Sequence, residues 1–118
     1  MTRVLIVDDQ PEFRSRLAQL ITLAGLSVIG EAGDIATAES IVQQEQPELA
    51  IIDVVLPRIN GLDGTRQLKV ICPGMKVIVI SAYIDHADIF RSAAQEAGAE
   101  AFVAKDDLDL AMIRKWKA

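Results

Sequence analysis

The sequence has few of the residues that build disulfide scaffolds, thiolate metal sites or aromatic cores. It contains a single cysteine, Cys72, which excludes a disulfide within the chain and a cysteine-rich metal site. Aromatic residues make up only 4% of the chain, so a core must be built mainly from Val, Ile, Leu and Ala. One thiol is compatible with a reducing compartment.

The chain also lacks an excess of basic residues and long hydrophobic runs. Its formal net charge is -5, which argues against direct contact with nucleic acid or an anionic membrane, because such binding begins from a basic surface. No apolar run approaches the roughly 18 residues that span a bilayer. The apolar run near the N-terminus is too short for a signal peptide and turns acidic at once. These absences predict a cytoplasmic domain without membrane association.

What is present is the composition of one globular domain. The 118 residues are 51% apolar and 25% charged, which is enough to bury one substantial core and too apolar for a disordered chain. The chain has no internal repeat, low-complexity segment or linker. We therefore expect residues 1–118 to form a single domain.

Short apolar runs alternate with longer amphipathic segments along the whole chain. Several runs are rich in β-branched residues and almost continuous in apolar character, which is typical of strands buried on both faces of a parallel sheet. The predicted strands are residues 3–7, 26–32, 49–53, 76–81 and 101–104.

Five amphipathic segments follow these strands and predict helices. Asp34 and Asp85 are placed to cap the second and fourth helices, and Gly25 and Gly98 are placed to end the first and fourth. The predicted helical segments are residues 11–25, 34–47, 61–74, 85–98 and 106–118. Five consecutive βα units predict an α/β fold, an open parallel sheet with helices on both faces.

Polar side chains stand where four of the five predicted strands end. Asp8 and Asp9 follow the first strand, Asp53 closes the third, Ser81 closes the fourth and Lys105 follows the fifth. Because parallel strands bring their carboxyl ends to one edge of the sheet, these side chains should meet there. Carboxylates with few fixed partners suit Mg²⁺, and a lysine and a hydroxyl suit phosphate oxygens. The set therefore indicates phosphoryl transfer.

Four motifs make the chain resemble the response-regulator receiver domains of bacterial two-component signalling. They are VDD at 7–9, DVVLPRING at 53–61, SAY at 81–83 and AFVAK at 101–105. The resemblance covers essentially the whole chain. It implies a flavodoxin-like, doubly wound (βα)5 fold with strand order 2-1-3-4-5. The domain would then act as a phosphoacceptor in signalling and not as an enzyme with a separate substrate.

The resemblance also implies a role for each acidic residue of the site. Asp53 would accept a phosphoryl group from the phosphohistidine of a sensor histidine kinase or of a phosphotransfer protein. Asp9 would ligate Mg²⁺ directly, and Asp8 would reach the metal largely through water. The Asp53 carboxylate and the backbone carbonyl of Val55 would complete the protein ligands.

The other implied roles concern the response to phosphorylation. Lys105 would pair with Asp53 before phosphorylation and with the phosphoryl group after it. Ser81 would move to donate a hydrogen bond to a phosphoryl oxygen, and Phe102 would turn inward behind it. The face formed by helix 4, strand 5 and helix 5 would then change its population of states, with a phosphorylation-dependent homodimer as one outcome.

Some positions depart from the usual pattern of that family. Asp106 follows the lysine where the family often has a proline in a cis peptide, and a cis Lys105–Asp106 bond would cost about 3 kcal/mol, so the sequence leaves both isomers open. Phe102 stands where tyrosine is frequent. Val55 and Tyr83 flank the site at positions that tune phosphate lifetime in the family, and we expect them to slow attack by water.

Other interpretations of these residues stay open at this point. Asp9 could serve only as the N-cap of the first helix, which would contribute about 1 kcal/mol. A receiver-like adaptor that ignores phosphate would keep the fold, although every expected site position holds a competent residue. A phosphatase of the haloacid dehalogenase type would need an Asp-x-Asp spacing, whereas here Asp8 and Asp9 are adjacent. The motif of a nucleotide-binding P-loop does not occur. The domain could act alone or as the N-terminal part of a DNA-binding transcription regulator, because the pair Lys105–Asp106 resembles the receivers that precede helix-turn-helix domains.

Overall fold

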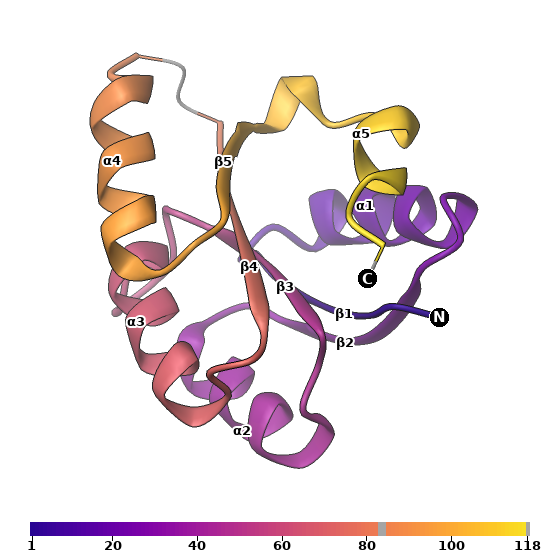
Figure 1. The fold of residues 1–118 in the computed structure, drawn as a ribbon, viewed down its shortest axis with the longest axis horizontal. Helices are drawn as coiled ribbons and strands as arrows, with labels where there is room; N and C mark the ends of the chain where they lie inside the picture. Colours follow the sequence, from indigo (N-terminus) through magenta and orange to yellow (C-terminus); the bar gives the residue numbers. More distant parts are fainter. Residues whose placement is uncertain (83–84, 118) are drawn as a thin grey trace.

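The computed structural model describes residues 1–82 and 85–117. Its centre is a five-stranded parallel sheet with the order β2-β1-β3-β4-β5 (Figure 1). The strands are β1 (Arg3–Val7), β2 (Ser27–Ala32), β3 (Leu49–Asp53), β4 (Lys76–Ser81) and β5 (Ala101–Ala104). The predicted fold class, strand order and strand positions are confirmed. Tyr83 lies outside the described residues, so the expectation about its position beside the site stays a prediction.

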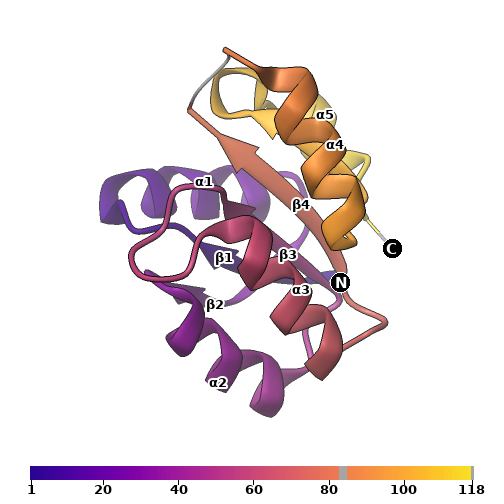
Figure 2. The ribbon, with the colours of Figure 1, turned by 90° about the vertical axis from the view of Figure 1, so that its left-hand side faces the viewer.

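Within the described residues, five α-helices cover the two faces of this sheet (Figures 1 and 2). They are α1 (Pro11–Leu23), α2 (Ile35–Glu45), α3 (Gly61–Ile71), α4 (Ala87–Ala97) and α5 (Leu110–Arg114). Helices α2, α3 and α4 pack on one face, and α1 and α5 pack on the other. No helix in the described part of the chain has both the length and the apolar character that a membrane crossing requires.

The strands contribute side chains to two separate hydrophobic clusters, because alternate side chains point to opposite faces of the sheet. In β1, Leu5 and Val7 pack with α2, α3 and α4, whereas Val4 and Ile6 pack with α1 and α5. All four side chains are fully buried. This explains the nearly continuous apolar character of the strand sequences, since burial on both faces leaves no polar side to the strand.

Most helix ends follow the predicted signals. The Asp34 carboxylate accepts a hydrogen bond of 2.8 Å from the Thr37 amide and caps α2 as predicted. Gly98 follows the end of α4 with φ of 102°, a left-handed conformation that glycine adopts at little cost. The prediction that Asp85 caps α4 is wrong. His86 holds the cap position, itself with a positive φ of 62°, and its side chain makes no capping hydrogen bond.

The last segment is not the single helix predicted over residues 106–118. A 3-10 turn, η1 (Lys105–Asp107), comes first, and α5 begins only after Asp109, whose carboxylate accepts a 2.8 Å hydrogen bond from the Met112 amide. Aspartate favours caps and turns over helix interiors, so the Asp-rich stretch delays the helix. Ile113 is fully buried, and Leu108 packs partly buried in the same hydrophobic cluster.

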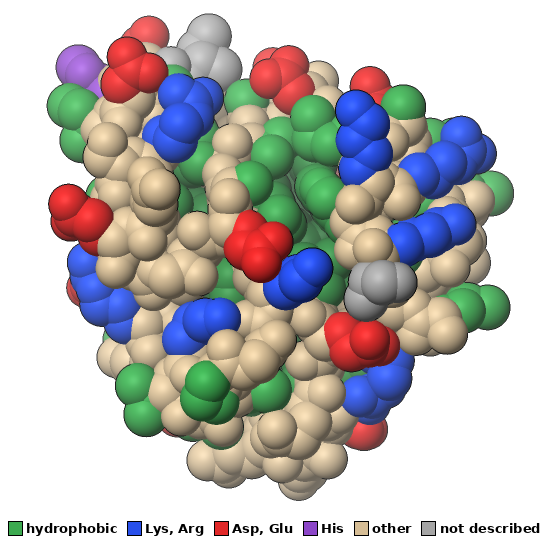
Figure 3. Space-filling view, in the orientation of Figure 1, with side chains coloured by type: hydrophobic (Ala, Val, Ile, Leu, Met, Phe, Trp, Pro, Cys, Tyr) green, Lys and Arg blue, Asp and Glu red, His purple; other side chains and the backbone are tan. Residues whose placement is uncertain are grey.

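The short α5 leaves part of the sheet thinly covered. Between α4 and α5, hydrophobic side chains line a hollow on the face shown in Figure 3. Ala101 and Val103 of β5 are only partly buried, as are Leu110 and Trp116 from the last segment. The apolar character of this face follows from the sheet, while its exposure follows from the length of α5.

Candidate functional site

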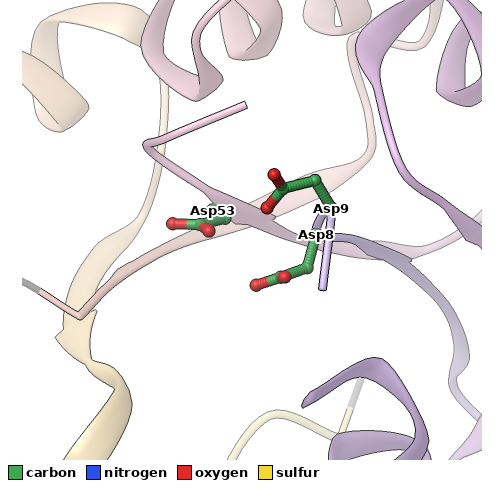
Figure 4. A group of neighbouring side chains, drawn as sticks. All are labelled: Asp8, Asp9 and Asp53. Carbon is green, nitrogen blue, oxygen red and sulfur yellow. The ribbon is translucent and has the colours of Figure 1, made fainter. Parts of the chain in front are cut away.

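Three carboxylates converge at the carboxyl edge of the sheet, at the ends of two neighbouring strands. Asp8 and Asp9 follow β1 directly, and Asp53 is the last residue of β3. Figure 4 shows the three side chains beside one another at these strand ends. One oxygen from each lies within 4.8 Å of the others. Asp8 and Asp53 are buried, whereas Asp9 is exposed, so the cluster opens to solvent on the Asp9 side.

The capping interpretation of Asp9 is wrong. Gln10 holds the N-cap position of α1 and makes no side-chain capping hydrogen bond, and Pro11 begins the helix. It is Asp8 that turns back on the chain, because its Oδ1 accepts a 2.8 Å hydrogen bond from the Gln10 amide. This hydrogen bond fixes the Asp8 carboxylate and leaves its Oδ2 directed into the site.

Lys105 brings positive charge into the cluster from the start of η1. Its Nζ lies 2.6 Å from Asp8 Oδ2 and 3.2 Å from Asp53 Oδ2, and only 9% of its side chain is exposed. The expected pairing of Lys105 with Asp53 is present, but the shorter ion pair is with Asp8. The Lys105–Asp106 peptide is trans, as are the other peptide bonds of the described residues.

The charges in this cluster shift its proton affinities. Burial raises the pKa of Asp53 from 3.8 to about 6; the Lys105 charge opposes this increase and the Asp8 charge adds to it. Burial lowers the pKa of Lys105, but the hydrogen bond to Asp8 and the charges of Asp53 and Asp8 together raise it above 10.5. The lysine therefore stays protonated, while burial and the neighbouring Asp8 charge oppose ionisation of the Asp53 carboxyl.

The loop after Asp53 approaches the Asp53 backbone closely. The Val55 amide donates a 3.3 Å hydrogen bond to Asp53 Oδ1, and the Gly61 amide donates a 2.8 Å hydrogen bond to the Val54 carbonyl. A Cβ on Gly61 would lie 1.9 Å from the Asp53 carbonyl oxygen. Glycine is needed at position 61 because a side chain would collide with the backbone of Asp53.

Ser81 and Phe102 lie on the two strands beyond Asp53. Ser81 ends β4, is fully buried and pairs in register with Ala104, the residue before Lys105. Phe102 of β5 is buried, and its ring stacks on Phe90 of α4 with centroids 6.0 Å apart. Both residues thus lie between the acidic cluster and α4.

Sequence reasoning missed two residues of α1 that contact the site. Arg14 Nη1 donates a 2.5 Å hydrogen bond to the Asp8 carbonyl, and its Nε lies 3.4 Å from Glu31 of β2. The Phe13 ring faces Lys105, with Nζ 4.1 Å from the ring centroid. The only available signal was their position one turn after Asp8 and Asp9, and that position also fits an ordinary amphipathic helix.

The cluster is suited to a small divalent cation. Asp8 Oδ2 is completely buried beside the Lys105 ammonium, and this ammonium alone does not compensate the negative charge of the three clustered carboxylates in a region of low dielectric constant. Carboxylate oxygens from Asp8, Asp9 and Asp53 are the hard ligands that Mg²⁺ prefers, and the solvent side at Asp9 leaves room for the waters that it keeps.

The fold and the site together define a class: a doubly wound α/β domain with an acidic cluster and a lysine at the carboxyl edge of its sheet. Comparison with known proteins narrows this class. The family model of the response regulator receiver domain matches residues 4–115. The chain belongs to this family of two-component signalling domains.

Individual relatives agree with this assignment. The chain is 37% identical to the chemotaxis protein CheY of Thermotoga maritima over 103 residues, which cover 87% of this chain and 84% of that protein. It is 34% identical to the transcriptional regulatory protein PdtaR of Mycobacterium tuberculosis over 105 residues, 87% of this chain but only 49% of that protein. The chain thus spans about half the length of this second relative.

A solved structure agrees with the fold. The CheX–CheY–BeF3–Mg²⁺ complex of Borrelia burgdorferi contains a chain that is 25% identical to this one, with a TM-score of 0.85. The match covers 96% of this chain and 84% of that one.

Proposed function

We propose that this domain is a phosphorylation-controlled switch in which Asp53 accepts a phosphoryl group from a phosphohistidine. The observation that carries the proposal is the setting of Asp53. Its buried carboxylate lies within 4.8 Å of the Asp8 and Asp9 oxygens and 3.2 Å from Lys105 Nζ. The donor would be a sensor histidine kinase or a phosphotransfer protein, and such a donor places the domain in the cytoplasm.

Asp8, Asp9, Asp53 and the backbone carbonyl of Val55 would hold Mg²⁺. Bound there, the ion would neutralise carboxylate charge and bind an oxygen of the transferred group. The carboxylate cluster and its open side at Asp9 support this ligand set. The similar chain from Borrelia burgdorferi, found in a complex with BeF3 and Mg²⁺, supports the same chemistry.

In the transfer step, one Asp53 carboxylate oxygen attacks phosphorus. A P–O bond forms, the P–N bond of the donor breaks, and its electron pair leaves with the imidazole nitrogen, which takes a proton from solvent. Lys105 would leave Asp8 and Asp53 for a phosphoryl oxygen, and the Ser81 hydroxyl would donate to another. The domain catalyses only its own phosphorylation and dephosphorylation, so it is not an enzyme with a separate substrate.

The new dianionic group would then bias the conformation of α4, β5 and α5. Ser81 would move toward the phosphoryl group, and Phe102 would turn further inward behind it. The Phe90–Phe102 stack supports this route, because any movement of the Phe102 ring must change its contact with α4. A phosphorylation-dependent homodimer through this face is one expected consequence.

The test is the intact mass of the wild-type protein and of Asp53→Asn after incubation with acetyl phosphate, with Mg²⁺ and with EDTA. We expect one phosphoryl adduct on the wild type that requires Mg²⁺ and is absent from the variant. No adduct under any condition would support the phosphate-insensitive adaptor, and sustained hydrolysis of a free phosphate ester would support the phosphatase.

A further inference from the structure

The ammonium of Lys105 is held by three groups from three elements. Asp8 and Asp53 supply carboxylate oxygens 2.6 and 3.2 Å from Nζ, and the Phe13 ring lies with its centroid 4.1 Å away. An ammonium has three N–H donors, and the two carboxylates accept from the side of the sheet. The negative face of the ring takes the place that solvent would otherwise hold.

Phe13 is held by the core and not by the lysine. It lies in the first turns of α1, on the stripe that also carries the buried Leu17 and Ile21. Its ring packs against the cluster between the sheet, α1 and α5. The ring therefore keeps its place when the lysine moves, and it favours one position of the ammonium over others.

That position conflicts with the proposed metal site. Asp8 Oδ2 is completely buried, and the Lys105 ammonium is the cation beside it. A divalent ion that uses the Asp8 carboxylate, directly or through water, must weaken this ion pair. Any contact that holds the ammonium against Asp8 therefore opposes the binding of the ion.

We propose that Phe13 is a positioning residue that sets the affinity of the site for divalent cations by holding Lys105 against Asp8. The inference rests on the proposed function, because it assumes that the acidic cluster binds Mg²⁺. A cation–π contact of ordinary strength corresponds to a change of about two- to fivefold in an equilibrium constant. Loss of the ring should thus tighten Mg²⁺ binding by about that factor.

The test is calorimetric titration of the whole chain with Mg²⁺, without any phosphodonor. Phe13→Leu should bind Mg²⁺ about two- to fivefold more tightly than wild type, and Phe13→Tyr, which keeps the ring face, should match wild type. Phe90→Leu makes the same change at a ring that stacks on Phe102 and should also match wild type. Where Phe13→Leu fails to fold, Phe13→Met makes the same test.

Repeating the substitution in a Lys105→Met background separates an effect of Phe13 on the position of Lys105 from an effect on packing. In Lys105→Met, the ring has no ammonium to hold, so adding Phe13→Leu should leave Mg²⁺ affinity unchanged. Unchanged or weaker binding in Phe13→Leu alone, or equal tightening in the Lys105→Met background, would overturn the inference. A wild-type protein that binds no Mg²⁺ would instead overturn the proposed function.

Discussion

Lys105 Nζ lies closer to Asp8 than to Asp53, at 2.6 Å against 3.2 Å. The lysine therefore neutralises the Asp8 carboxylate, which the Gln10 amide holds in place, and it leaves the Asp53 carboxylate only partly compensated. Burial and the Asp8 charge keep the pKa of Asp53 high despite this lysine. In this arrangement Asp53 is the buried carboxylate that gains most from a further cation.

The raised pKa of Asp53 predicts a pH-dependent gain of stability in Asp53→Asn. The folded-state pKa of about 6 exceeds the ordinary pKa of 3.8. The stability that protonated Asp53 contributes is therefore fully present below about pH 4 and is lost as the pH rises through 6. Without divalent ions, the variant should exceed wild type by at most about 3 kcal/mol at pH 7.5 and by little at pH 4. Urea denaturation at both pH values measures this.

Asp34 supplies a control of opposite sign. The Thr37 amide, which donates to its carboxylate, lowers the pKa of Asp34, and Arg58 adds to the effect. Its stabilising charge is present above the ordinary value and is lost on acidification. Since pH 4 still lies above the ordinary value of 3.8, Asp34→Asn should lose nearly as much stability at pH 4 as at pH 7.5, and clearly less only in stronger acid. If the stability difference between wild type and Asp53→Asn does not vary with pH, then ionisation of Asp53 does not destabilise the fold, and the account is contradicted.

Gly61→Ala should be one of the more damaging substitutions in the chain. The added Cβ would lie 1.9 Å from the Asp53 carbonyl oxygen, so the loop must move away from Asp53. We expect a loss of about 3 kcal/mol or more, the upper range for a single substitution. Gly74→Ala is the matched control, because a Cβ there has nothing within 4 Å, and thermal unfolding of both variants should separate them clearly. Similar melting temperatures would show that the loop yields at low cost.

Asp9→Ala should weaken Mg²⁺ binding severalfold, because Asp9 is the carboxylate on the solvent side of the cluster. Asp88→Ala removes an exposed carboxylate that pairs with Arg91 on α4 and should leave the affinity unchanged. Calorimetric titration of both variants measures this. Equal metal affinity in Asp9→Ala and Asp88→Ala would remove Asp9 from the ligand set.

Arg14→Gln should lower stability by about 1–3 kcal/mol, the usual range for a hydrogen bond from a charged donor. Its guanidinium donates to the Asp8 carbonyl and reaches Glu31, so it ties the end of β1 to β2. Arg16→Gln, two residues along the same helix and exposed, should cost little. Chemical denaturation compares the two, and an equal cost at both positions would show that Arg14 acts only as a surface charge.

The sequence was enough to predict the sheet, because strands buried on both faces have an unmistakable apolar character. It also predicted which strand ends meet, because parallel topology brings Asp8, Asp53 and Lys105 to one edge. It did not predict which carboxylate Lys105 prefers, since that depends on side-chain reach across β1 and β3. The roles of Phe13 and Arg14 were also hidden, because helix periodicity accounts for residue spacing but not for contacts with another element.

The predictions of the α4 cap and of the extent of the last helix were wrong for a local reason. Aspartates at 85, 106, 107 and 109 are all competent caps, and the pattern alone does not say which of them the chain uses. The structure uses Asp109 and leaves α4 with His86 at its cap. Choices of this kind depend on how the preceding strand delivers the chain to the helix.

The central claim is that Asp53, and not its neighbours, accepts the phosphoryl group, and chemical mapping of the modified residue tests it most directly. An acyl phosphate on aspartate is reduced by borohydride to homoserine, whereas a free carboxylate is not. After treatment with acetyl phosphate and Mg²⁺, peptide mass spectrometry should find homoserine at position 53 and unchanged aspartate at positions 8 and 9. Homoserine at position 8 or 9, or at none of the three, would contradict the account.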